Sequence, residues 1–178
     1  MAWQIDTKHS QIEFAVRHMM LSTVRGRFKQ FSGDITIDEQ NPENSRFTAT
    51  IDVASIDTGD EGRDGHLRSA DFFDVAQYPT ATYTSTRIEK TGEDTYKVYG
   101  ELTLHGVTRE VPLELTLEGV TKDMQGNRRA GFTVQSSFNR KDFGLTWNVG
   151  LETGGVLVSE KVTITIEAQV VEPATVTA

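Results

Sequence analysis

Apolar and polar residues alternate strictly along most of the chain, so that side chains at positions i, i+2 and i+4 share one face. Eight such stretches follow one another, each with one apolar face, and threonine fills many positions of the other face. Alternation of this kind predicts half-buried β-strands. The apolar stripes of the eight stretches begin at Ile12, Phe31, Phe47, Ala81, Val98, Val111, Ala130 and Val162.

Short turn sequences separate several of the predicted strands: Asp38–Ser45, Thr91–Asp94, His105-Gly106 and Lys122–Asn127. Gaps of this length favour hairpins, so neighbouring strands are expected to pair antiparallel. A large antiparallel meander tends to curl and close, because closure removes its exposed edges. We therefore predict an all-β fold, an extended antiparallel barrel of about eight strands. Its interior would be filled by side chains or would hold one small ligand.

Two places depart from regular alternation. Phe28 is out of phase with Phe31, which predicts a bulge or bend between them. The segment 57–78 contains several glycines in its first part, followed by the apolar residues Leu67, Phe72 and Phe73. It predicts a short helical crossover whose phenylalanine pair packs against the barrel or over one mouth. Its length of roughly twenty residues suggests a lid or a ligand-facing element.

Composition narrows the class of protein. The 178 residues fit one domain, expected over 3–171 with a frayed tail over 172–178. The net charge of −8 argues against binding nucleic acid, which needs clustered cations. The absence of cysteine excludes disulfides, thiolate metal sites and cysteine nucleophiles.

No apolar run approaches the roughly 18 residues of a transmembrane segment. The chain opens without a leader peptide, so a cytoplasmic location is expected, or a periplasmic or secreted one if a leader has been removed.

Neither a catalytic nor a metal site is predicted, and no cofactor is expected. The four histidines lack a close metal-binding spacing. Asp6, His9 and Ser10 superficially resemble a hydrolase set, but adjacent residues on an extended chain point to opposite faces. We expect Asp6 or Ser10 to bond local backbone instead. The acidic run 57–64 lacks the order of a calcium loop and suits a helix start.

Three basic residues are candidates for contact with the polar end of a ligand. His18 continues the apolar stripe of its strand, so it should point inward, where a neutral imidazole offers one donor and one acceptor. Arg27 belongs to a basic cluster between Arg17 and Lys29, and Arg140 lies beside Lys141. Clusters that converge at one mouth would engage an anionic head group.

Four sequence motifs follow one another along the chain, and together they indicate a protein family more specifically than any one of them alone. They are Asp6–Ser10 leading into Phe14 to Met19, Arg63–Asp74 closing at Tyr78-Pro79, Gly100–Thr108, and Arg140–Leu145. With these motifs the chain resembles the YceI-like family, the lipocalin-like polyisoprenoid-binding proteins, over nearly its whole length, from Trp3 to Val171. The resemblance implies an extended barrel with a long internal pocket for lipids with isoprenoid or other long apolar tails. It also implies possible homodimers.

The residues and the resemblance together predict a non-catalytic protein that binds, carries or sequesters a long-chain isoprenoid lipid, of the polyprenyl phosphate or isoprenoid quinone type. One alternative is an enzyme that acts on the bound lipid through His18 or Arg140. Another is a stress-related structural barrel with a filled interior. Gly33 and Gly100 lie on inward stripes, which favours an open lumen. The residues expected to line the apolar pocket are Phe14, Val16, His18, Phe31, Ile35, Phe72, Phe73, Tyr83, Leu102, Leu104, Leu115, Phe132, Val134, Phe138 and Phe143.

Overall fold

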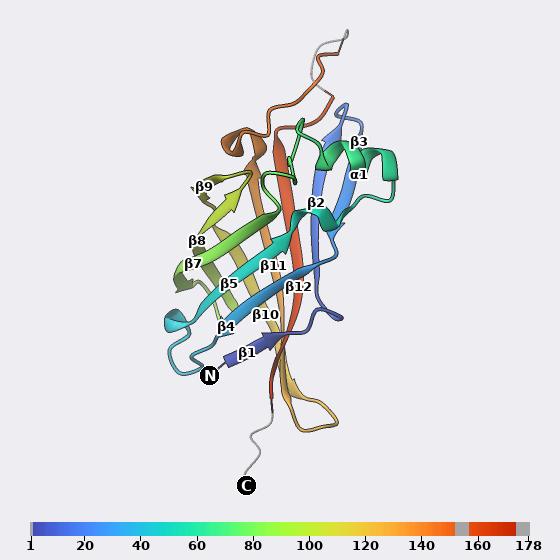
Figure 1. Ribbon diagram of the computed structural model, residues 1–178. Helices are drawn as coiled ribbons and strands as arrows, with labels where there is room; N and C mark the ends of the chain where they lie inside the picture. The colour runs from blue at the N-terminus through green and yellow to red at the C-terminus, as the bar shows by residue number, and fades with distance from the viewer. Residues whose placement is uncertain (1, 152–156, 174–178) are drawn as a thin grey trace.

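The computed structural model describes residues 2–151 and 157–173, in which a 12-stranded antiparallel sheet carries one α-helix and three 3₁₀ turns (Figure 1). The predicted tail lies outside the described residues apart from Glu172 and Pro173. The strands are β1 (Ala2–Ile5), β2 (Gln11–His18), β3 (Ser22–Phe28), β4 (Phe31–Thr36), β5 (Arg46–Asp52), β6 (Ile56–Asp57), β7 (Thr80–Lys90), β8 (Thr95–Leu104), β9 (Val107–Glu110), β10 (Leu113–Lys122), β11 (Arg128–Asn139) and β12 (Lys161–Glu172). The helical elements are η1 (Pro42–Asn44), η2 (Val53–Ser55), α1 (Glu61–Arg68) and η3 (Arg140–Phe143).

Eight of these strands close into a barrel in the order β1-β4-β5-β7-β8-β10-β11-β12. The short strand β1 closes it, because it pairs with β4 on one side and with β12 on the other. All of these pairings are antiparallel. The predicted all-β, eight-stranded antiparallel barrel is therefore confirmed.

The long strand β12 has two neighbours along one edge. Its other edge pairs with β11 over the whole length, from Asn139↔Lys161 to Arg128↔Glu172. The edge opposite β11 pairs with β2 between residues 163 and 167 and then with β1 at residues 170 and 171. The first predicted stripe is thus β2, which lies beside β12 and continues into β3 and β6 rather than closing the barrel. The short β1, which has no apolar stripe of the predicted kind, takes the closing position between β4 and β12.

The predicted bend between Phe28 and Phe31 is confirmed. There β3 ends and β4 begins, and only Lys29 and Gln30 separate them. The Lys29 amide donates to the Ser55 carbonyl (3.2 Å), and the Asp52 amide donates to the Gln30 carbonyl (3.0 Å). The change of direction lets β3 pair with β6 while β4 pairs with β5.

The predicted helical crossover is also present. Asp60 caps α1 by accepting a hydrogen bond from the Arg63 amide (3.0 Å), as suits a helix start. The buried Asp64 accepts from both the amide and the hydroxyl of Thr58 (2.9 and 2.6 Å), which fixes the helix to the preceding loop. In Figure 1 α1 lies with the tip of the β2–β3 hairpin at the upper end of the barrel, and β1 lies near the lower end.

Apolar side chains form two separate clusters inside the sheet. The larger one gathers residues of β5, β7, β8, β10 and β11 around Val98 and Phe143. The smaller one is centred on Trp3, Ala130 and Val170, close to where β1 closes the barrel. Within the described residues, no helix has the length and apolar character needed to cross a bilayer.

Candidate functional site

The barrel contains a cavity of about 370 Å³ that opens to the surface. Its wall is formed by residues of β2, β3, β5, β7, β8, β10, β11 and β12, by the crossover that contains α1 and by the segment that follows β11. This volume lies within the range of roughly 300–1,000 Å³ that is typical of small-molecule sites. Nine of the residues predicted for the apolar pocket line this cavity: Phe14, Val16, His18, Phe72, Phe73, Tyr83, Leu102, Leu104 and Phe138.

Six of the predicted pocket residues do not lie on the cavity wall. Ile35 and Phe132 pack against the smaller cluster around Trp3. Leu115, Val134 and Phe143 belong to the larger cluster, where they pack behind or beside the wall, and Phe31 is half-buried on β4. For Ile35 and Phe132 the physical reason is that Trp3 and its neighbours fill the far end of the barrel, so the lumen does not run through its whole length.

Three aromatic rings stand together where the crossover meets the barrel. The ring centroids of His66 and Trp147 are 4.7 Å apart, those of Phe72 and Trp147 are 5.2 Å apart, and those of His66 and Phe72 are 5.1 Å apart. All three residues line the cavity. Sequence reasoning placed the Phe72–Phe73 pair against the barrel or over one mouth. Phe72 is buried and Phe73 packs against the larger apolar cluster of the barrel. Sequence reasoning missed Trp147. Trp147 follows η3 in a stretch where apolar and polar residues do not alternate. The one feature of the sequence that could have pointed to it is its position two residues after the Arg140–Leu145 motif.

Arg140 is almost completely buried, with 3% exposure, and touches the cavity. Its guanidinium donates to the carbonyl oxygens of Leu145 (2.7 Å), Trp147 (2.9 Å), Ser159 (2.9 Å) and Val158 (3.4 Å). Burial lowers the pKa of this side chain, and the nearby Glu160 carboxylate opposes that effect. Most of its donors are taken by the backbone, so Arg140 chiefly holds the segment after η3 against β12.

The head-group candidates differ in position. His18 lies on the cavity wall, in agreement with its inward stripe. Arg27 does not, because it lies on the outer face of β3 with 54% exposure and 3.6 Å from Asp57. The structure thus removes Arg27 from the set that faces the lumen. Arg17 and Arg63, which are both exposed, line the cavity instead.

Two glycines lie beneath aromatic rings of the wall. A Cβ atom on Gly26 would lie 2.3 Å from the Phe14 ring, and one on Gly100 would lie 2.5 Å from the Tyr83 ring. Tyr83 is buried, donates its hydroxyl to the Val111 carbonyl (2.8 Å) and has its pKa raised by that burial. The interpretation that Gly100 leaves space for the lumen was wrong, because the Tyr83 ring occupies that space. Gly33 does not line the cavity either, and a Cβ there would press on the Thr48 carbonyl at 3.0 Å.

A second hollow of about 540 Å³ lies beside α1, β6 and the β3–β4 bend. Four of its five charged lining residues are engaged with other side chains or with backbone, and Glu61 is exposed at the start of α1. Lys29 pairs with Asp57 at 3.2 Å, and Arg68 donates to the carbonyls of Ala54 and Ile56. We place the candidate site in the smaller interior cavity, because its wall is mainly apolar, whereas the hollow beside α1 is lined mostly by charged and polar residues.

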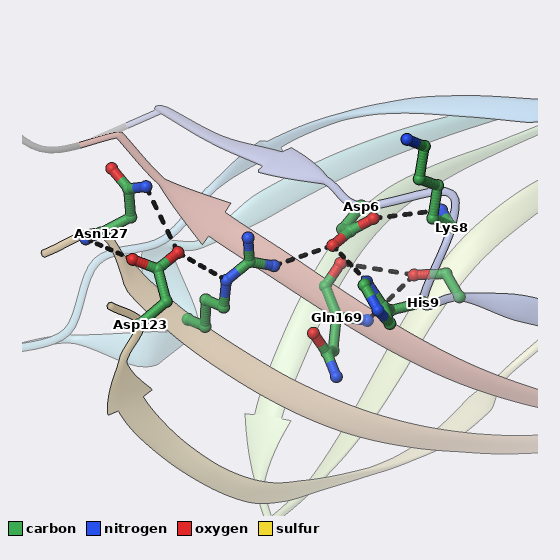
Figure 2. A network of polar contacts seen from close by, with 8 residues as sticks. Asp6, Lys8, His9, Asp123, Asn127 and Gln169 are labelled. Carbon is green, nitrogen blue, oxygen red and sulfur yellow. Dashed lines mark hydrogen bonds and ion pairs between the residues drawn. The ribbon is translucent and has the colours of Figure 1, made fainter. Parts of the chain in front are cut away.

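The group Asp6, His9 and Ser10 forms a structural network (Figure 2). The Ser10 hydroxyl accepts from the Gln169 amide (3.0 Å) and lies 3.3 Å from the Gln169 carbonyl, whereas the His9 ring bonds the Asp6 carboxylate at 2.8 Å. Asp6 also accepts from the Lys8 amide (3.1 Å). The expectation of local backbone bonding is confirmed, and Ser10 has no base beside it. Among residues 2–151 and 157–173, no cluster of three or more histidine, aspartate or glutamate side chains is placed to hold a metal ion.

The fold and the cavity define a class: a closed, lipocalin-like antiparallel barrel with an apolar interior site partly covered by a helical crossover. A family model described as the YceI-like domain matches residues 3–170, and the chain belongs to that family. It is 43% identical to protein YceI of Escherichia coli over 143 residues, which are 80% of this chain and 74% of the relative. The identification made from the four motifs is thereby confirmed.

Solved structures share the same architecture. BcnA of Burkholderia cenocepacia superimposes with a TM-score of 0.78 at 27% identity, covering 93% of this chain and 98% of BcnA. A polyisoprenoid binding domain from Saccharophagus degradans, implicated in plant cell wall breakdown, superimposes with a TM-score of 0.70 at 21% identity, covering 96% of this chain and 98% of that domain. At that identity the second likeness concerns the fold.

Proposed function

We propose that this protein binds the apolar tail of an isoprenoid lipid in the barrel cavity without chemically changing it, as a carrier or a sequestering protein. The observation that carries the proposal is the interior cavity of about 370 Å³, whose wall consists mainly of aliphatic and aromatic side chains. The related fold of the polyisoprenoid binding domain from Saccharophagus degradans is consistent with such a ligand.

Burial of the tail supplies the binding free energy. Each methylene-sized group removed from water contributes about 0.8 kcal/mol, so a five-carbon unit contributes on the order of 4 kcal/mol before ordering costs are subtracted. Branched prenyl units suit a wall made of phenylalanine, leucine and isoleucine side chains, with which they make dispersion contacts. No reacting group is required for such capture.

The charges on the cavity wall indicate which head groups fit. The wall includes Arg17, Arg63 and Arg140, together with His18 and His66, and no aspartate or glutamate is among its described residues. A phosphate or a quinone carbonyl presents oxygen acceptors that these donors can bind. We place the head group beside Arg17 and Arg63, because both side chains are exposed, whereas Arg140 is buried and donates to four carbonyl oxygens.

The direct test is to purify the full chain without detergent, extract it with organic solvent and identify the extract by mass spectrometry. We expect an isoprenoid lipid at a stoichiometry approaching one per protein, and binding of added geranylgeranyl phosphate or a short-tailed quinone to delipidated protein. No extracted lipid together with no binding of either probe would refute the proposal. Chemical conversion of a bound probe would instead favour an enzyme.

Two neighbouring positions on β5 offer a matched pair of variants. Ala49 lines the cavity, while Thr50 points to the outer face of the same strand. Ala49→Phe adds a ring to the lumen and should weaken probe binding at least tenfold, measured by fluorescence titration. Thr50→Phe adds the same ring outside and should leave binding unchanged. Unfolding midpoints of both variants show whether each is folded, and equal binding by the two would place the ligand elsewhere.

A further inference from the structure

Among the described residues, six large hydrophobic side chains are exposed, and four of them gather at the cavity end of the barrel. Met19, Met20 and Leu21 form the tip of the β2–β3 hairpin and are 39%, 60% and 79% exposed, and Val149 is 45% exposed. The Met19 amide donates to the Leu157 carbonyl (2.8 Å), and the Leu157 amide donates to the Val149 carbonyl (2.9 Å), so these segments are adjacent. We call Met19, Met20, Leu21 and Val149 the rim patch. Exposed apolar residues grouped in this way mark interaction surfaces.

The backbone of the hairpin tip is strained in a way that its sequence does not relieve. Both Met19 and Met20 have positive φ angles (52° and 57°), and the Leu21 amide donates to the His18 carbonyl at 3.0 Å. This is the geometry of a type I′ turn, in which asparagine and glycine are strongly preferred. Two bulky apolar side chains therefore occupy positions that are unfavourable for them in both backbone geometry and solvation. Strain of this kind persists at functional sites.

The surroundings of the tip are cationic although the protein carries a net charge of −8. Between Glu13 and Asp34 every charged residue is an arginine or a lysine. Arg17 donates to the Met20 carbonyl and to the Thr23 hydroxyl, and among the described residues neither Arg17 nor Arg25 has a carboxylate partner. Cations that flank an exposed apolar tip are complementary to the phosphates of an anionic bilayer.

We propose that the β2–β3 tip docks this protein on the surface of a membrane that contains anionic lipids. Met19, Met20 and Leu21 enter the boundary between head groups and acyl chains, while Arg17 and Arg25 contact lipid phosphates. Arg17 and His18 line the cavity directly next to the tip, so docking brings the mouth of the cavity to the lipid surface. This inference concerns the partner surface and does not depend on which ligand the cavity holds.

Vesicle flotation with the full chain tests this proposal. We expect the protein to float with vesicles of phosphatidylcholine mixed with phosphatidylglycerol and to float much less with phosphatidylcholine alone. Raising the ionic strength from about 0.1 M to about 1 M shortens the Debye length from about 10 Å to about 3 Å and should weaken the association. Absence of any flotation with the anionic vesicles would overturn the proposal.

The double variant Met19→Asn/Met20→Gly separates membrane docking from folding. Asparagine and glycine fit the positive φ angles, so the unfolding midpoint should stay or rise. Partitioning to anionic vesicles should fall about tenfold, which corresponds to about 1.4 kcal/mol. Met124→Ser is the matched control, because Met124 is 98% exposed on the β10–β11 connection and lies outside the rim patch. Equal losses in both proteins would contradict docking through the tip.

Two further measurements distinguish other occupants of the patch. Arg25→Glu should lower partitioning to anionic vesicles while leaving binding of cavity probes unchanged. Sedimentation in the absence of vesicles reports the oligomeric state. A dimer that the Met19→Asn/Met20→Gly variant dissociates, with no vesicle association in the parent protein, would show that a second copy covers the rim patch. If the parent protein does not bind vesicles but yields lipid on extraction, membrane docking is refuted and lipid binding in the cavity still stands.

Discussion

Arg140 shows how a single residue supports a cavity without offering its charge to the contents. The buried guanidinium joins the loop after η3 to the start of β12 through four carbonyl oxygens, and it has no carboxylate hydrogen-bond partner among the described residues. Its planar fork suits several acceptors at once, which a lysine ammonium cannot match in the same geometry. Removing it would leave buried carbonyls without donors, which is costly.

Arg140→Met is therefore expected to lower the free energy of unfolding by about 3 kcal/mol, since methionine keeps the apolar stem and removes every donor. Urea denaturation monitored by tryptophan fluorescence measures this loss, and Trp147 reports on the affected segment. Arg87→Met serves as the control, because Arg87 is exposed, pairs with Glu89 and lies over the Tyr99 ring, so its loss should lower the stability by no more than about 1 kcal/mol. Similar losses in the two variants would contradict this structural role.

At the residue scale, alternation predicted side-chain direction better than it predicted function. Phe14, Val16 and His18 reach the lumen, as their shared stripe on β2 requires. Alternation cannot show how far along a barrel the lumen stays open, so Ile35 and Phe132 were assigned to the pocket although they pack beside Trp3. Basic clusters were visible in sequence, but only the pairing with Asp57 reveals that Arg27 faces outward.

Among the connections between elements, the network around Asp6 joins three parts of the barrel (Figure 2). Arg129 on β11 donates to Asp6, which follows β1, and to Asp123, which follows β10, at 2.8 Å in both cases. The His9 hydrogen bond is the largest influence on Asp6, followed in the lowering direction by Arg129, and together they hold the pKa of Asp6 at about 2. The carboxylate thus contributes to the closure of the barrel near β1.

Asp6→Asn tests this contribution through pH. The folded pKa of about 2 lies below the ordinary value of 3.8, so the stabilisation is fully present above about pH 4 and disappears as the pH falls towards 2. The variant should be less stable at pH 7 by at most about 2 kcal/mol, and its stability should depend less on pH between 4 and 2. Thermal unfolding across this range measures both effects. The exposed Asp34→Asn serves as the control, and equal curves for the parent protein and Asp6→Asn would show that the network contributes nothing.

Secondary-structure elements were predictable where the alternation was long. The hairpins, the bend near Phe28 and the crossover all follow from local patterns. The four-residue strand β1 and the polar strand β3 did not show an apolar stripe, so their roles were missed. The division of the β12 edge between β2 and β1 depends on pairings across the whole chain, which a local pattern does not contain.

For the whole molecule, the two ends of the barrel differ in physical character. The end near α1 has the cavity, its arginines and the rim patch, whereas the end near β1 is filled by Trp3, Ala130 and Val170. Under the proposed function, a tail that entered from the α1 end would therefore meet the packed cluster around Trp3. The asymmetry indicates one route for entry and exit, at the end where we also propose docking to a membrane.

A closed floor predicts how affinity depends on tail length. A cavity of about 370 Å³ has room for about 12 groups the size of a water molecule, whose share of volume is about 30 Å³, or about two five-carbon prenyl units. In a series of prenyl phosphates with one to six units, affinity should rise steeply over the first two or three units and then change by less than about threefold per unit. Isothermal titration calorimetry measures the series, and the heat-capacity change should level off at the same length, because it reports the apolar surface that is buried. A steep rise that continues through six units would show that the cluster around Trp3 opens to admit the tail, and Trp3 would then form part of the binding site.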